Sequence, residues 1–71
     1  MKPEIGQIWK HYKGSLHKII AIGKHSETLE DMVVYEHEGN ELSLIWIRPL
    51  SMWTEEVEID NKKLPRFTLF K

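Results

Sequence analysis

The chain has 71 residues, no cysteine and a formal net charge of -1, with ten Lys or Arg against eleven Asp or Glu. This length suits one small domain over residues 1–71, and without cysteine neither disulfide bonds nor thiolate metal sites can stabilise it. The balanced charge argues against a protein whose main task is binding nucleic-acid phosphates, which requires an excess of basic side chains on one face.

No targeting or membrane segment is recognisable. The first residues, MKPEIGQIW, lack the apolar stretch of a signal peptide. The longest apolar runs, IIAI and LIWI, have four residues each, far fewer than a membrane span needs. We therefore expect a cytoplasmic protein with no membrane association.

Three strands are predicted in the first half of the chain. Residues 6–12 form the first, which ends at the turn KGS, and residues 16–24 form the second, rich in isoleucine. Residues 32–38 form the third, dense in Val and Tyr. Runs this short fit strands better than helices.

The second half predicts another strand, a helical turn and a hairpin. EGNE at 38–41 is a turn, and the strand over 42–48 ends at Pro49, which has no N–H to donate. One helical turn is expected near 49–54. VEIDNKKLPRF at 57–67 predicts a last hairpin with Asp60 and Asn61 in a tight turn.

Short strands at hairpin spacing, with no long helix between them, predict an all-β fold. The expected architecture is a small five-stranded SH3-like barrel with one short helical turn near residues 49–54. An OB-fold is the second choice.

The segment IWIRP raises the question of which side chains face the core. Because strand residues alternate, Ile45 and Ile47 share one face while Trp46 and Arg48 share the other, and either pair could point inward. Both arrangements place the arginine beside an aromatic ring, a contact worth about 0.5–2 kcal/mol. A structural role in bracing the sheet is slightly favoured over a role in ligand binding.

The sequence HSE at 25–27 invites comparison with a catalytic triad. In an extended chain Ser26 points away from His25 and Glu27, so the nucleophile cannot reach its base. A turn closed by Ser26 and Thr28 is the favoured interpretation.

The four histidines, His11, His17, His25 and His37, follow no standard metal-ligand spacing. Surface or hydrogen-bonded roles are favoured, although clustering in the folded chain stays open. No metal and no cofactor are predicted.

Aromatic side chains could form a recognition surface, though packing in and around the core is favoured for them: Tyr12, Tyr35, Trp46 and Trp53. Arg48 and Arg66 could clamp an anionic group, but pairing with Glu27, Glu55 or Glu56 is the commoner fate of such arginines.

Four blocks of sequence are similar to a known family. HYKG at 11–14, HSETLEDMVVY at 25–35, IWIRPLSMW at 45–53 and LPRF at 64–67 resemble the domain-of-unknown-function 1653 family of small bacterial proteins. The blocks occur in the family's order and span nearly the whole chain. The resemblance implies an SH3-like barrel and brings no established reaction.

The departures from the family pattern are specific. His17 stands where tyrosine is usual, Trp53 where phenylalanine is usual, and Asp60-Asn61 where Asp-Gly is usual. Residues 36–43 depart most, so contacts made there are not carried over from the family.

The matched polar positions, together with Trp46, make up the candidate ligand-binding set: Tyr12, Lys13, His25, Glu27, Trp46, Arg48 and Arg66. The leading hypothesis is a non-catalytic binding module for a peptide, a protein partner or a small anionic ligand. No residue is predicted to be catalytic.

Two alternatives remain. One is a minimal enzyme or enzyme-accessory domain with His25 and Glu27 as acid and base, since the two side chains share one side of an extended chain. The other is weak nucleic-acid binding, which the charge balance disfavours. An exposed sheet edge also allows a weak homodimer.

Overall fold

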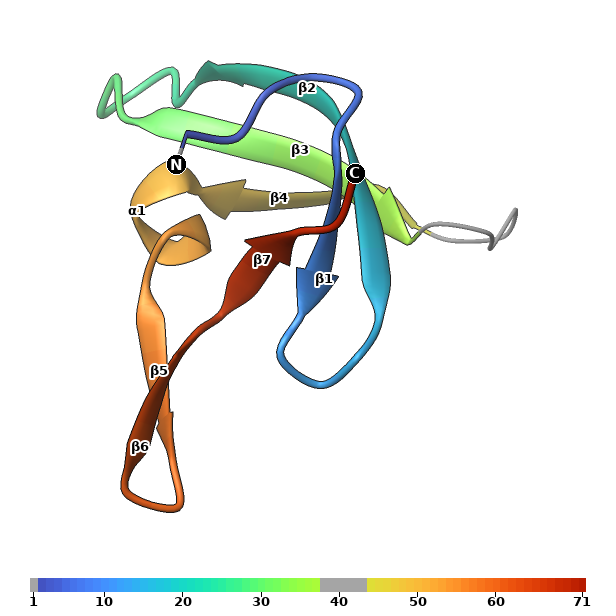
Figure 1. Cartoon of the computed structure of the whole chain (residues 1–71). Helices are drawn as coiled ribbons and strands as arrows, with labels where there is room; N and C mark the ends of the chain where they lie inside the picture. The colour runs from blue at the N-terminus through green and yellow to red at the C-terminus, as the bar shows by residue number, and fades with distance from the viewer. Residues whose placement is uncertain (1, 38–43) are drawn as a thin grey trace.

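The computed structural model describes residues 2–37 and 44–71, which form seven strands and one short helix (Figure 1). In chain order these are β1 (Ile8–His11), β2 (Leu16–Lys24), β3 (Asp31–His37), β4 (Trp46–Pro49), α1 (Leu50–Trp53), β5 (Glu56–Ile59), β6 (Lys62–Pro65) and β7 (Phe67–Leu69). The predicted all-β class and the helical turn near 49–54 are confirmed.

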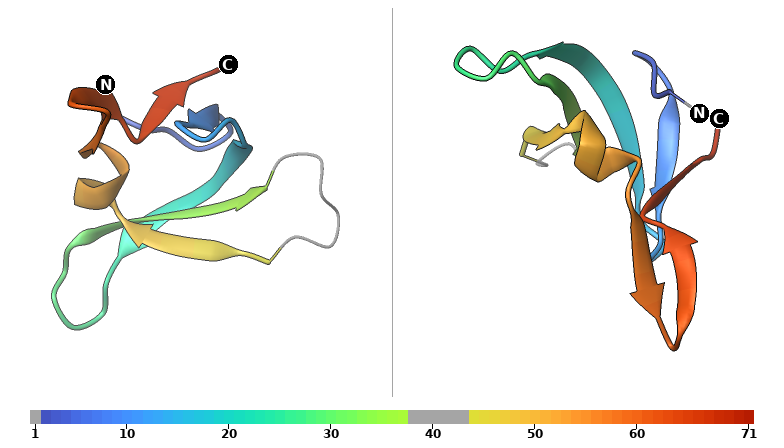
Figure 2. Two further views of the ribbon diagram at one scale, coloured as in Figure 1. Left: turned by 90° about the horizontal axis from the view of Figure 1, so that it is seen from below. Right: turned by 90° about the vertical axis from the view of Figure 1, so that its left-hand side faces the viewer.

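Five strands make one antiparallel sheet in the order β4-β3-β2-β1-β7, while β5 and β6 form a second, two-stranded sheet. The large sheet curls, and the β5–β6 hairpin projects from it as an arm (Figure 2). The five-stranded sheet does not close into a barrel, because the outer strands β4 and β7 do not pair with each other. They have four and three residues, and the Arg48 guanidinium lies between them, 5.5 Å from the centre of the Phe67 ring.

The core lies on the concave side of this sheet. Its buried apolar side chains come from five elements: Trp9, Ile19, Val33, Tyr35, Trp53 and Phe67. Trp53 is 0% exposed and stacks on Phe67, with ring centres 3.8 Å apart and planes 5° apart. The edge of Tyr35 meets the same indole at 4.9 Å. The short helix α1 therefore places one large ring against the inside of the curled sheet.

A β-bulge decides which isoleucines of β2 face inward. The β2–β3 register shifts between Ile19 and Ala21. Ile19 is fully buried, Ile20 reaches the surface, and Ile22 packs against the core. Simple alternation would have placed Ile22 on the face of Lys18. A bulge also strengthens the local bend, which fits the strong curl of the sheet.

The open question about β4 is answered by burial. Ile45 and Ile47 are 53% and 64% exposed, so the aliphatic pair faces solvent. Arg48 points inward and its Nε donates a hydrogen bond of 3.3 Å to the hydroxyl of Tyr35. The expected arginine–aromatic contact is therefore present, with Tyr35 and Phe67 as its partners.

The predicted boundaries of the strands agree with the observed ones to different degrees. The second strand has the predicted residues, 16–24, whereas the first and third begin or end one or two residues away from their predicted limits. The turn at 38–41 and the first residues of the predicted fourth strand, 42–43, lie outside the described residues. The missed strand is β7, which begins at Phe67, the last residue of the predicted hairpin over 57–67.

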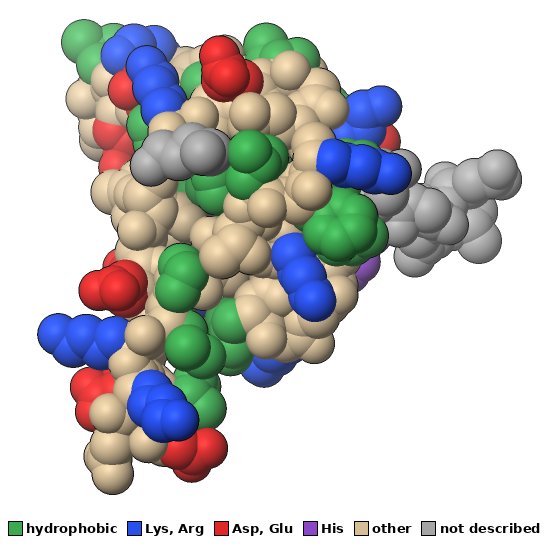
Figure 3. Space-filling model, in the orientation of Figure 1, with side chains coloured by type: hydrophobic (Ala, Val, Ile, Leu, Met, Phe, Trp, Pro, Cys, Tyr) green, Lys and Arg blue, Asp and Glu red, His purple; other side chains and the backbone are tan. Residues whose placement is uncertain are grey.

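The tight turn of the arm has the predicted residues and conformation. Asp60 and Asn61 have φ angles of 50° and 64°, as a two-residue hairpin with both central residues in the left-handed region requires. Basic and acidic side chains lie next to one another on this arm (Figure 3). In the described ranges, no helix is long and apolar enough to cross a membrane.

Candidate functional site

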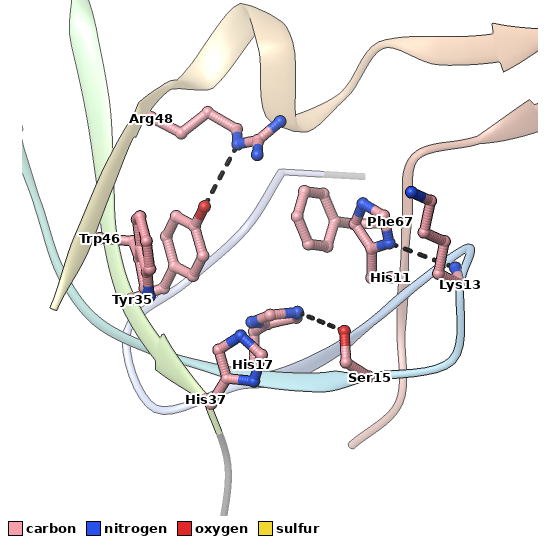
Figure 4. Close-up of a pocket in the computed structure, with 9 residues that line it drawn as sticks. All are labelled: His11, Lys13, Ser15, His17, Tyr35, His37, Trp46, Arg48 and Phe67. Atoms are coloured by element: carbon pink, nitrogen blue, oxygen red, sulfur yellow. Dashed lines mark hydrogen bonds between the residues drawn. The ribbon is translucent and has the colours of Figure 1, made fainter. Parts of the chain in front are cut away.

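A pocket of about 290 Å³ opens on the concave side, where the outer strands β4 and β7 fail to meet (Figure 4). Nine side chains line it: His11, Lys13, Ser15, His17, Tyr35, His37, Trp46, Arg48 and Phe67. None of these residues is acidic. We call this site the concave pocket.

Strand alternation brings most of these side chains to one face. Tyr35 and His37 are two residues apart on β3, and Trp46 and Arg48 are two apart on β4. The antiparallel register then sets His17 opposite His37 and Tyr35 opposite Trp46. Three neighbouring strands therefore present a continuous polar and aromatic wall.

The two cations of the pocket are Arg48 and Lys13. The Arg48 guanidinium is held by the Tyr35 hydroxyl and the face of Phe67. Lys13 is exposed in the β1–β2 turn, and its Nζ lies 5.8 Å from the centre of the Tyr12 ring. Across residues 2–37 and 44–71 neither cation forms an ion pair. Both positive charges are therefore available to a bound anion.

Three imidazoles meet at His17. Its ring centre lies 4.4 Å from that of His37 and 6.1 Å from that of His11. His17 is 5% exposed, and its Nε2 is 2.9 Å from the Ser15 hydroxyl. Its buried Nδ1 has no hydrogen-bond partner in the described part of the chain. No described group of three or more His, Asp or Glu has a geometry suited to a metal ion.

The environment keeps two of these rings neutral at pH 7. Burial, reinforced by the neighbouring imidazoles of His37 and His11 and by Arg48, lowers the pKa of His17 from 6.5 to about 4. Burial and nearby cations, Arg48 foremost, also lower the pKa of His11. Arg48 and Lys13 therefore supply positive charge to the pocket at this pH, whereas His17 and His11 do not.

Of the predicted site residues, only Lys13, Trp46 and Arg48 lie together in the concave pocket. Tyr12 lines a separate hollow beside β6 and β7. The guanidinium of Arg66 forms a 2.6 Å ion pair with Glu55, which is one of the structural pairings expected from the sequence.

His25 and Glu27 lie in the turn between β2 and β3, outside the pocket. The Nδ1 of His25 accepts hydrogen bonds from the backbone amides of Glu27, at 3.0 Å, and Thr28, at 3.3 Å. The Ser26 hydroxyl donates to the Glu27 carboxylate at 3.4 Å and makes no bond to His25. The turn interpretation of this segment is confirmed, with His25 rather than Ser26 as the side chain that closes it.

The candidate ligand-binding set left out six of the lining residues, although clustering of the histidines and a recognition role for Tyr35 had been left open: His11, Ser15, His17, Tyr35, His37 and Phe67. The sequence contained one indication that His17 belongs to a buried polar site. It alternates with the buried Ile19 on β2 and stands where the family usually has tyrosine. A polar ring in a core position calls for a polar neighbour. The register that brings His37 next to it could not be read from spacing alone.

The comparisons with known proteins agree with the resemblance found in the sequence. Residues 7–69 match the model of the family described as "Protein of unknown function (DUF1653)". The crystal structure of a DUF1653 protein from Bordetella bronchiseptica is similar, with 29% sequence identity, a TM-score of 0.75, and coverage of 94% of this chain and 87% of that one. None of the curated proteins matches this chain. This chain belongs to the DUF1653 family.

Proposed function

We propose that the protein is a non-catalytic binding module whose concave pocket holds a small anionic ligand. The observation that carries this proposal is the charge of the lining: Arg48 and Lys13 contribute two cations without ion-pair partners in the described ranges, and no lining residue is acidic. A carboxylate, phosphate or sulfonate placed between them gains charge-assisted hydrogen bonds.

The pocket also suits a flat, apolar ligand body. The indole of Trp46 is 47% exposed, and it shares a strand face with Arg48 two residues away. A planar ring stacked on Trp46 would place its acidic substituent toward the guanidinium. A volume of about 290 Å³ is near the lower end of the roughly 300–1,000 Å³ typical of small-molecule sites.

The Ser15–His17 pair has the reach of a nucleophile and its base, since Oγ and Nε2 are 2.9 Å apart. Two features argue against catalysis by this pair. No described carboxylate orients the ring, because the His17 Nδ1 has no partner. A pKa lowered to about 4 also makes this imidazole a poor base at pH 7. Ligand binding is therefore preferred to acyl transfer.

Other expectations from the sequence stay predictions. These are a peptide or protein ligand, a weak homodimer, a cytoplasmic location, an SH3-like architecture, weak nucleic-acid binding and the acid–base role of His25 and Glu27. The mixed charges on the arm give a nucleic-acid backbone no single-sign track on the face drawn in Figure 3.

The test is calorimetric titration of the protein with acetate, benzoate, phenyl phosphate and benzenesulfonate. We expect the ring-bearing anions to bind more tightly than acetate. We expect Arg48→Met to weaken benzenesulfonate binding about tenfold or more, because a hydrogen bond to a charged group contributes about 1.5–3 kcal/mol. Lys13→Met should weaken it less, since Lys13 is exposed and its charge is better screened.

Lys18→Met is the matched control. Lys18 is exposed and, by alternation, its side chain leaves β2 on the face opposite His17. The Lys18→Met variant loses one positive charge, as Lys13→Met does, and its affinity for benzenesulfonate should be unchanged. Equal losses in the two lysine variants would mean that general charge, rather than the pocket, attracts the anion. No binding by the wild-type protein to any of the four anions would contradict the proposed function.

A further inference from the structure

The concave pocket holds more ionisable groups than anion binding needs. His11 from β1, His17 from β2 and His37 from β3 surround one space, with the His17 ring 6.1 Å and 4.4 Å from the other two. The other groups facing His17 are Arg48 on β4, Lys13 and Ser15 in the β1–β2 turn, Tyr35 on β3 and Phe67 on β7. All the ionised groups among them are positive.

Without a bound anion, the neighbouring cations of the described chain oppose protonation of His17 and His11. Desolvation and the repulsion of nearby cations both disfavour imidazolium, which is the direction found for His17 and His11. An anion bound between the imidazole rings and the two cations, Arg48 and Lys13, makes the electrostatic potential at the rings less positive. Opposite charge within about 4–6 Å favours the charged form of a titrating group, so the bound anion strengthens proton binding by the cluster.

We infer that ligand binding in the concave pocket is coupled to proton uptake by two rings of the histidine cluster, His17 and its neighbour His11, so that the protein binds its anion more tightly as the pH falls. The inference rests on the proposed anion-binding function and adds a regulation to it. Linkage makes the effect reciprocal: a ligand that raises the proton affinity of the cluster is itself bound more tightly by the protonated form.

His17 is the best placed of the three to transmit this effect. Its neutral ring uses Nε2 with the Ser15 hydroxyl and leaves the buried Nδ1 without a partner in the described residues. A protonated ring donates from both nitrogens. It keeps the contact with Ser15, and its added positive charge attracts an anion held beside Arg48 and Lys13.

The experiment uses benzenesulfonate, because its single negative charge does not change between pH 5.5 and 8. Its dissociation constant is measured by calorimetry across this range, in buffers of different ionisation enthalpy, with near-ultraviolet circular dichroism confirming the fold at each pH. We expect affinity to rise by up to tenfold per pH unit on acidification, the limit for uptake of one proton. The apparent heat should change with the buffer in proportion to the protons taken up.

Variants locate the proton. His17→Tyr, which introduces the residue usual in the family, should reduce the pH dependence, and the combined variant His11→Gln, His17→Tyr should abolish it. His25→Gln is the matched control and should leave it intact, because His25 lies in the β2–β3 turn. If benzenesulfonate binds with the same affinity at every pH and with no buffer-dependent heat, the coupling is refuted while anion binding stands. If benzenesulfonate fails to bind at any pH, the proposed function fails with it.

Discussion

Replacing Trp53 with alanine is expected to lower the free energy of unfolding by about 3–5 kcal/mol, the usual cost of removing a buried tryptophan. Trp53 is 0% exposed and stacks on Phe67 at 3.8 Å, with the edges of Tyr35 and Trp9 against it. A domain of this size has a total stability of about 4–11 kcal/mol. Urea denaturation followed by circular dichroism should therefore find the unfolding midpoint of the variant at a much lower urea concentration, and a wild-type stability near the lower end of this range would leave the variant largely unfolded.

Trp46→Ala is the matched control for this change. The same side chain is removed, but Trp46 is 47% exposed on an outer strand, so its loss should cost about 1 kcal/mol or less. Equal losses for the two tryptophans would mean that α1 does not supply the centre of the core.

Acidification is expected to destabilise the fold between pH 6.5 and 4. His17 has an unfolded pKa of 6.5 and a folded pKa of about 4, so over this interval the unfolded chain binds a proton that the native pocket rejects. Stability is full above pH 6.5 and falls as the pH drops toward the folded value. The shift corresponds to about 3 kcal/mol, since one pKa unit equals about 1.4 kcal/mol. The midpoint of urea denaturation, measured at half-unit steps of pH, gives this curve.

His17→Tyr isolates the contribution of this histidine. Tyrosine does not titrate in this range, so the variant should lose less stability than the wild-type protein between pH 7 and 4.5. The lowered pKa of Asp31, paired with Lys24 at 2.7 Å, produces acid destabilisation in both proteins and cancels in the comparison. Parallel curves for the two proteins would show that His17 is not the group responsible.

Local chemistry made several elements predictable. Asp60 and Asn61 are among the residues that tolerate the left-handed region, so the tight turn of the arm followed from their identity. Pro49 ended β4 and preceded the helical turn because it lacks an N–H. These features depend on neighbouring residues in the chain, and the sequence displays them directly.

Features that depend on distant residues escaped prediction. A closed sheet requires β4 to pair with β7. The residues of these two strands do not by themselves indicate that the strands stay apart, with the Arg48 guanidinium over the Phe67 ring between them. The histidine cluster depends on the register that pairs His17 with His37, twenty residues away in the chain. A one-residue bulge at Ile20 similarly reversed the expected face of later β2 residues.

The polar residues that match the family pattern were a poor guide to which residues share a site. Arg48 and Arg66 both match the family pattern, yet one lines the pocket and the other pairs with Glu55. His25 also matches the pattern, and its ring closes a turn by accepting hydrogen bonds from two backbone amides. Ion pairs and turns of this kind use the same types of polar residue as ligand-binding sites do, so residue type alone does not separate the two roles.

The central claim is that the concave pocket binds small anions beside Trp46 and Arg48. The most direct test is a titration of the ¹⁵N-labelled protein with benzenesulfonate, observing the three indole N–H resonances by nuclear magnetic resonance. The indole of Trp46, which lines the pocket, should shift most. Those of Trp9, bonded to Gln7, and of the buried Trp53 should move little. The claim would be contradicted if the Trp46 indole resonance did not shift. It would also be contradicted if the resonance of Trp9, which lines a separate apolar groove, shifted instead.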